Sequence, residues 1–158
     1  MTDVNKTLAD LGITLPDAPA PAANYVPFVQ TGNLVFVSGQ VSMDADGLVR
    51  GKLGENMSVE DAQKAARLCA LNLLAHVSVA CDGDLNRVAR VVKLTGFVNC
   101  TADFNQHPQV INGASDLLAE VFGDAGKHAR AAVGSSSLPL GVAVEVEGIF
   151  EIHDNTAS

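Results

Sequence analysis

Two stretches of the chain carry apolar residues at the three- and four-residue spacing of a helix buried on one side. The first begins with Ser58-Val59-Glu60-Asp61, a capping box in which the Ser58 hydroxyl accepts from a free backbone N–H and Asp61 reaches back to the cap. Its apolar residues are in phase and end before Asp82-Gly83: Val59, Ala62, Ala66, Cys69, Leu73, Val77 and Ala80. The second stretch ends at Gly123 and has its own set in phase: Val110, Ile111, Ala114, Leu117, Leu118 and Val121. The pattern predicts two helices, the first with one face on a sheet.

Runs rich in β-branched and aromatic residues surround these helices. Residues 25–30 and 34–38 flank the turn Thr31-Gly32-Asn33 and predict a hairpin, and residues 88–99 predict a strand between the helices. Residues 129–135 and 142–152 predict two final strands around Leu138-Pro139-Leu140-Gly141. We therefore expect an α+β (α/β) fold of order ββαβαββ, with a mixed sheet and both helices on one face.

The last predicted strand has two periodic sides that compete for burial. One side carries Val142, Val144, Val146 and Phe150, and the other carries Ala143, Glu145, Glu147, Ile149 and Glu151. Helices cover only one face of the predicted sheet, so oligomerisation through the other face would resolve the competition. The low share of charged residues, 18%, points the same way, because part of the surface is expected to be buried against another subunit.

The Pro- and Ala-rich residues 15–23 form a connector between a short amphipathic N-terminal piece and the body. We expect an N-terminal extension at 1–22, one domain at 23–153, and a C-terminal tail at 154–158. The start of the chain lacks the pattern of a secretory signal, and no run approaches the ~18 apolar residues of a membrane span. The prediction is a cytoplasmic protein with no membrane partner.

Charge and motifs exclude several classes of function. The net charge of −8 argues against nucleic acid as a partner, because affinity for the phosphate backbone comes from clustered Lys and Arg. Cys69, Cys81 and Cys100 lie in apolar or strand-like runs, without the spacing of a zinc site, and are predicted to be reduced core residues. Residues 123–128 lack the full spacing of a P-loop, and neither a zinc helix nor a dinucleotide-binding motif occurs. We expect no metal and no cofactor.

Four segments together resemble the Rid family, also called YjgF or endoribonuclease L-PSP-like. They are GNLVFVSGQ (residues 32–40), VVKLTGFVN with the following Asp103-Phe104, Asn112 in the second helix, and ARAAV…LPLGVAVEVEGIFEI (residues 129–152). The arginine stands eight residues before Leu-Pro and fifteen before a glutamate, a combination more specific than any single segment. The resemblance covers about residues 22 to 152 and implies a chorismate-mutase-like fold assembled as a homotrimer, with clefts between neighbouring subunits.

The resemblance also assigns roles to residues of this chain. It places Arg130 where catalytic members hold a substrate carboxylate, which suits the planar fork of guanidinium donors. It makes Glu145 the acid near the reacting end of the ligand, Tyr25 an aromatic of the cleft wall, and Gly39 a backbone position beside the ligand. Two further positions belong to this binding set: Asn112, which we expect to support loop structure, and Ala132, where the family often has a cysteine.

The activity that the resemblance implies is hydrolysis of small carboxylate-bearing imines or enamines, such as 2-aminoacrylate, to a 2-keto acid and ammonia. An alternative from another class is a noncatalytic trimer that binds 2-keto acids, or has a regulatory role, with the same Arg130. Ribonuclease activity is the least attractive reading, because the chain is acidic and lacks a basic aromatic groove.

Overall fold

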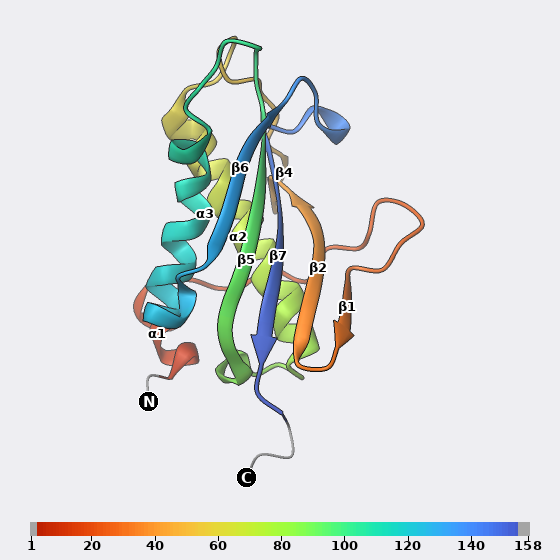
Figure 1. Ribbon diagram of the computed structural model, residues 1–158, viewed down its shortest axis with the longest axis vertical. Helices are drawn as coiled ribbons and strands as arrows, with labels where there is room; N and C mark the ends of the chain where they lie inside the picture. The colour runs from red at the N-terminus through yellow and green to blue at the C-terminus, as the bar shows by residue number, and fades with distance from the viewer. Residues whose placement is uncertain (1–2, 155–158) are drawn as a thin grey trace.

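The computed structural model describes residues 3–154, in which a five-stranded sheet forms one layer and helices form the other (Figure 1). The strand order is β1 (Phe28–Thr31), β2 (Leu34–Val41), β7 (Val144–Ile152), β5 (Val88–Asn99) and β6 (Ala129–Ser135). The β5 and β6 strands are parallel, and the other neighbours are antiparallel. The predicted mixed sheet is confirmed, and β1 and β6 form its two edges.

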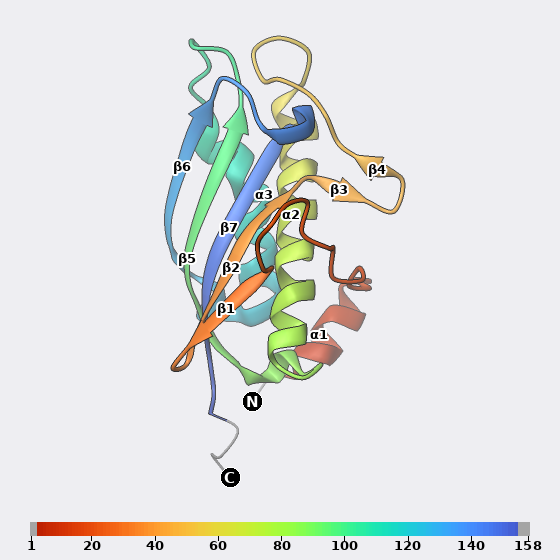
Figure 2. The same cartoon turned by 90° about the vertical axis from the view of Figure 1, so that its right-hand side faces the viewer.

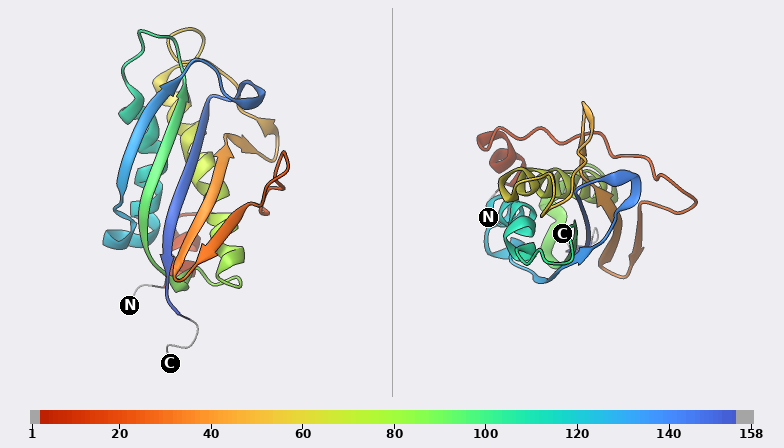
Figure 3. Two further views of the ribbon diagram at one scale, coloured as in Figure 1. Left: turned by 45° about the vertical axis from the view of Figure 1, so that its right-hand side comes forward. Right: turned by 90° about the horizontal axis from the view of Figure 1, so that it is seen from above.

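Both long helices lie on one face of the sheet, as the sequence predicts (Figures 2 and 3). These are α2 (Val59–Ala80) and α3 (His107–Phe122). The Ser58 hydroxyl accepts from the backbone N–H of Asp61 at 3.1 Å and so caps α2. The apolar face of α3 is the predicted one, because the six in-phase residues are its buried residues.

The edge near β1 differs from the prediction in three ways. The β1 strand starts at Phe28 instead of residue 25. Where strand pairing ends, the Ser38 N–H donates a hydrogen bond to the Pro27 carbonyl, and the Ser38 hydroxyl donates one to the Val26 carbonyl. The β2 strand continues beyond Gly39 through a bulge between Val37 and Gln40. A small hairpin of β3 (Met43–Asp44) and β4 (Gly47–Leu48), not predicted, follows. The upper half of β2 therefore has no strand on its outer side.

A short N-terminal helix, α1 (Val4–Asp10), packs beside α3 and the turn Leu85–Arg87. Val4 and Leu8 are buried in the main hydrophobic core. The Val4 N–H donates to Asn86 Oδ1 at 2.8 Å, and the Asn86 amide donates to Asp3 Oδ1 at 3.1 Å. Residues 3–10 are thus docked on the domain through apolar contacts and hydrogen bonds.

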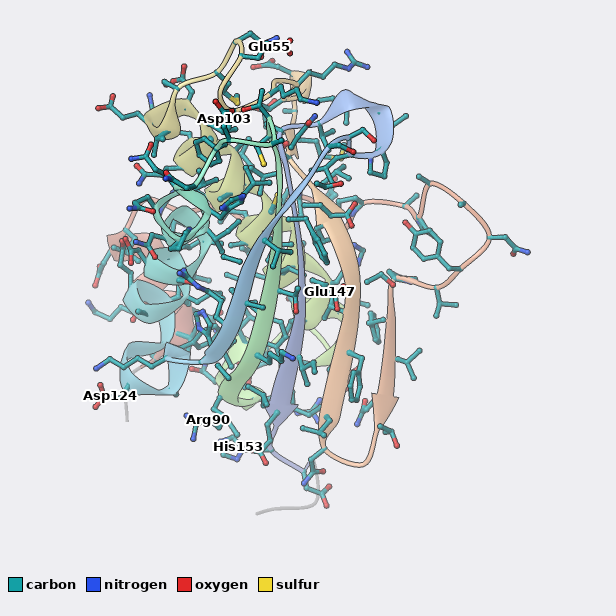
Figure 4. The ribbon with its side chains drawn as sticks, turned by 45° about the horizontal axis from the view of Figure 1, so that its top comes forward. Glu55, Arg90, Asp103, Asp124, Glu147 and His153 are labelled. Atoms are coloured by element: carbon teal, nitrogen blue, oxygen red, sulfur yellow. The ribbon has the colours of Figure 1, made fainter. Side chains whose placement is uncertain are left out.

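The face of the sheet opposite the helices carries charged and apolar side chains together. Along β7 the residues alternate as predicted, with Val144, Val146 and Phe150 buried and Glu147 exposed on the open face (Figure 4). On the same face, the Phe36 side chain of β2 is 41% exposed. The three cysteines lie on the other side of this sheet or at its ends, and all are buried free thiols, as predicted.

Candidate functional site

Arg130 lies on the edge strand β6, and its side chain reaches across to α3. Its guanidinium donates to Asn112 Oδ1 at 2.9 Å, to Ser115 Oγ at 3.2 Å and to the Pro108 carbonyl at 3.5 Å. The residue is half-buried, and no carboxylate within residues 3–154 forms an ion pair with it. Arg130 is therefore held by neutral acceptors beside a pocket of ≈280 Å³.

A chain of hydrogen bonds extends from Arg130 to the turn before β6. Ser115 Oγ lies 2.9 Å from His128 Nε2, and His128 Nδ1 lies 2.7 Å from the Gly126 carbonyl oxygen. A carbonyl can only accept, so Nδ1 carries the proton and neutral His128 accepts from the Ser115 hydroxyl. Burial lowers the pKa of His128, and the positive charge of Arg130 lowers it further, against the raising effect of the bond to Gly126. The neutral imidazole thus orients the hydroxyl on which Arg130 rests.

Three other predicted residues line a second pocket of ≈460 Å³ at the unpaired edge of β2. Tyr25, Gly39 and Glu145 contribute to this β2-edge pocket. Its outer wall is the connector segment from Pro19 to Ala23, and its remaining lining is largely apolar: Pro27, Met43, Leu48, Pro139 and Leu140. The Tyr25 side chain is 46% exposed at the mouth. The N-terminal connector therefore helps to shape this pocket.

Glu145 lies directly over the backbone of Gly39. A Cβ atom added to Gly39 would come within 2.7 Å of Glu145 Oε2 and 3.0 Å of its Cδ, so a side chain there would displace the carboxylate. Burial raises the pKa of Glu145, and the nearby charge of Glu147 adds to the effect. A carboxyl group with a raised pKa beside a pocket is suited to accept and return protons.

Within one chain the predicted residues form two groups. Arg130, Asn112 and Ala132 lie at the β6 edge, where half-buried Ala132 packs against the core. Tyr25, Gly39 and Glu145 line the β2-edge pocket, with β7 and β5 lying between β2 and β6. The sequence did not predict this separation, because strand order depends on contacts far apart along the chain.

The sequence patterns did not single out three polar residues that line or support these pockets. Ser115 and His128 support Arg130, and His76 of α2 lines the β2-edge pocket. The alternation along β6 was a usable signal for His128, since it places residues 128 and 130 on one side of the strand. His76 gave no such signal, because it follows the apolar stripe of α2 closely.

Three further observations concern the rest of the described chain. Within residues 3–154, no three His, Cys, Asp or Glu side chains are grouped so that they could hold a metal ion. A cavity of ≈490 Å³ at the far end of the β1–β2 hairpin contains none of the predicted residues and is bordered by the Arg87–Asp82 pair. No helix of the described chain has the length and apolarity needed to cross a bilayer.

The mixed sheet with helices on one face is an α+β architecture of the chorismate-mutase-like type. The family model described as "YjgF/chorismate mutase-like, putative endoribonuclease" matches residues 5–152. The chain belongs to the YjgF (Rid) family. The predicted family membership is confirmed, and the match includes most of α1 as well as the sheet.

Relatives of this chain carry different names. The protein TCP17 of Trypanosoma cruzi is 48% identical over 96% of this chain and 95% of its own length. The crystal structure of the protein Atu1372, of unknown function, from Agrobacterium tumefaciens has a TM-score of 0.87 at 49% identity and covers 94% of this chain and 92% of its own. A 2-iminobutanoate/2-iminopropanoate deaminase of Dermatophagoides farinae is 29% identical over 89% of this chain and 94% of its own length.

Proposed function

We propose that this protein hydrolyses small carboxylate-bearing imines and enamines to 2-keto acids and ammonia, with Arg130 holding the carboxylate. The observation that carries the proposal is the half-buried Arg130 guanidinium, bound only by neutral acceptors and open to a pocket. A half-buried positive charge without an acidic partner favours an anionic ligand, and a carboxylate matches the guanidinium fork with two parallel bonds. The name of the mite relative, a 2-iminobutanoate/2-iminopropanoate deaminase, supports an imine as the ligand.

The proposed active site lies between two subunits of a homotrimer. Edge strand β6 carries Arg130 and pairs on one side only, and the upper half of β2 lacks an outer strand. If β6 of one subunit approaches the β2-edge pocket of the next, Arg130 of the first subunit faces Tyr25, Gly39 and Glu145 of the second. This arrangement would also cover part of the open face, where Phe36 is exposed.

The chemistry needs only positioning and one proton carrier. Arg130 fixes the carboxylate, and a water molecule adds to the imine carbon while Glu145 accepts one of its protons. The imine reacts in its protonated form, so this addition gives a neutral carbinolamine, and Glu145 then returns the proton to its nitrogen. As the carbon–nitrogen bond breaks, the carbinolamine hydroxyl gives its proton to Glu145, the carbonyl of the 2-keto acid forms, and the departing ammonia takes that proton up as ammonium. The raised pKa of Glu145 suits both steps, because the group gains and loses a proton more readily near neutral pH than an exposed glutamate.

The test is an imine-trapping assay. A dehydratase acting on serine supplies 2-aminoacrylate, semicarbazide traps the remaining imine, and the protein is expected to lower the trapped amount. Arg130→Ala should lower kcat/KM about 10²- to 10⁴-fold, since two charge-assisted bonds are lost. Arg90→Ala is the matched control, because Arg90 is an exposed arginine at the lower end of the sheet (Figure 4).

Two results would count against the proposal. Equal activity of the wild type and Arg130→Ala would show that Arg130 does not hold the substrate carboxylate. No acceleration with any imine, combined with 2-keto acid binding that depends on Arg130, would establish the noncatalytic alternative. Light scattering tests the trimer separately, and a mass near the 16.4 kDa of one chain would refute it. We place this activity in the cytoplasm, where the acidic chain with reduced cysteines is expected to act.

A further inference from the structure

His76 is a buried polar side chain that the mechanism above does not use. It is 2% exposed, and its Nε2 atom is buried without a hydrogen-bond partner. Asn72, one turn earlier on α2, is also buried, but its amide donates to the carbonyls of Val41 and Met43 at 3.4 and 3.3 Å. An unpartnered buried nitrogen costs folding free energy, so such a group calls for an explanation.

The position of His76 supplies that explanation, because the residue lines the β2-edge pocket. Glu145 enters this pocket from the open face of the sheet, whereas His76 enters it from the helix layer. The pocket therefore passes around the edge of β2, from the side of the proposed chemistry to the side of the helices. Pro19 to Ala23 close it from outside.

The lining between these two polar groups indicates what the pocket can hold. Met43, Leu48 and Leu140 offer apolar contact there. The volume of ≈460 Å³ lies in the range of about 300–1,000 Å³ found for ligand pockets, and one water takes up only about 30 Å³. The imine of a three-carbon acid would occupy a small part of this space, which leaves room for a longer, largely apolar side chain.

We propose that the β2-edge pocket binds the side chain of the substrate, and that His76 hydrogen-bonds a neutral polar group at its distal end. The preferred substrates are then 2-imino acids with a long, mostly apolar side chain that ends in a hydroxyl or a similar neutral group. This inference rests on the proposed imine chemistry at Glu145 and Arg130, and it adds a specificity-determining residue that the family resemblance does not assign.

The distal group is neutral for two reasons. Burial lowers the pKa of His76, so the imidazole is uncharged at neutral pH and does not balance an anion. The apolar lining also makes a charged end costly to desolvate. A hydroxyl both donates and accepts, so it matches His76 whichever ring nitrogen carries the proton.

The experiment uses two isosteric substrates. An L-amino-acid oxidase converts 6-hydroxy-L-norleucine and L-2-aminoheptanoate to imines whose side chains differ only in a terminal hydroxyl or methyl group. We expect wild-type kcat/KM to favour the hydroxyl-ended imine by about tenfold, as one satisfied hydrogen bond implies. His76→Leu should bring the ratio to one or invert it, whereas His76→Gln, which keeps a donor and an acceptor, should retain part of the preference.

Control measurements separate binding from folding. His153→Leu changes an exposed histidine and should leave the wild-type preference intact. His76→Leu should unfold at the same temperature as the wild type or higher, because it replaces an unsatisfied polar group with an apolar one of similar size. A wild-type ratio near one, or a preference that persists in His76→Leu, would overturn the inference.

Failure of the proposed chemistry gives a different result. If no imine is hydrolysed, calorimetry with the two corresponding 2-keto acids still tests the pocket. Tighter binding of the hydroxyl-ended acid, lost in His76→Leu, would support the pocket assignment while the deaminase proposal fails. Hydrolysis of 2-aminoacrylate without discrimination between the long imines would leave the deaminase proposal standing and overturn the role of His76.

Discussion

Arg130 Nη1 donates a 2.9 Å hydrogen bond to Asn112 Oδ1, so helix α3 sets the position of the guanidinium at the sheet edge. Asn112→Ala removes this acceptor, and we expect KM to rise about threefold to tenfold with a smaller change in kcat. Asn112→Asp should weaken substrate binding more, because its carboxylate would pair with Arg130 and compete with the substrate. Steady-state kinetics on one imine measure both variants, and tighter binding by Asn112→Asp would contradict this role.

The contact between Gly39 and Glu145 predicts coupled kinetic effects. Gly39→Ala should push the Glu145 carboxylate out of place and lower kcat more than it raises KM, since binding through Arg130 is retained. Glu145→Gln should lower kcat through loss of the proton carrier. The double variant should be little worse than either single variant, because both changes remove the same function. Fully additive losses would show that the two residues act independently.

Glu145 should also leave a signature in the pH dependence of stability. Its pKa is raised in the native state, so between 4.5 and that raised pKa the native protein holds the proton more tightly than the unfolded chain. Its contribution to stability is therefore present in acid and is lost as pH rises through the native pKa. Glu145→Gln removes this dependence, so urea unfolding should show the variant gaining stability relative to wild type from pH 4 to pH 8. A difference that does not change with pH would refute this.

His128 predicts the opposite slope in a different pH range. Its native pKa is lowered below 6.5, so its contribution to stability is present above pH 6.5 and is lost as pH falls to the native pKa. Protonation would also make Nε2 a donor and disturb the Ser115 hydroxyl under Arg130. His128→Gln should thus reduce the loss of stability in acid, measured by unfolding between pH 5 and pH 8. His153→Gln serves as the exposed control.

The crossing of α2 and α3 predicts a large stability effect far from either pocket wall. A Cβ on Gly113 would lie 2.0 Å from the Gln63 carbonyl oxygen and 2.8 Å from its carbon, which are backbone atoms that cannot move alone. Gly113→Ala should lower the free energy of unfolding by about 1–3 kcal/mol or more. Glu120→Ala, on the exposed side of the same helix, should change it by less than about 0.5 kcal/mol. Equal effects in the two variants would contradict the close packing.

Local patterns predicted the two long helices and the five strands of the main sheet, because each of these elements has its own spacing of apolar residues. The six buried residues of α3, the Ser58 cap of α2 and the bounds of β5 and β6 all follow from spacing within one segment. The bulge that carries β2 beyond Gly39 depends on a partner strand more than a hundred residues away, and the sequence did not indicate it.

The surroundings of the candidate residues were harder to predict for the same reason. Arg130 could be singled out from its neighbours in the chain, but its supports, Ser115 and Asn112, come from a helix in another layer. His76 lies in an apolar stretch and becomes visible only when the pocket beside it is known. The grouping of Tyr25, Gly39 and Glu145 in one pocket required the strand order.

The docking of the first helix has an effect at a distance. Residues 11–27 connect α1, fastened to Asn86, with the start of β1, and the middle of this strap forms the outer wall of the β2-edge pocket. The strap is held at both ends, so a change at Asp3 or Asn86 can reshape the wall without altering any residue that lines it. Substitutions at these two positions can therefore change the shape of the β2-edge pocket during evolution, while Arg130 and Glu145 keep their places.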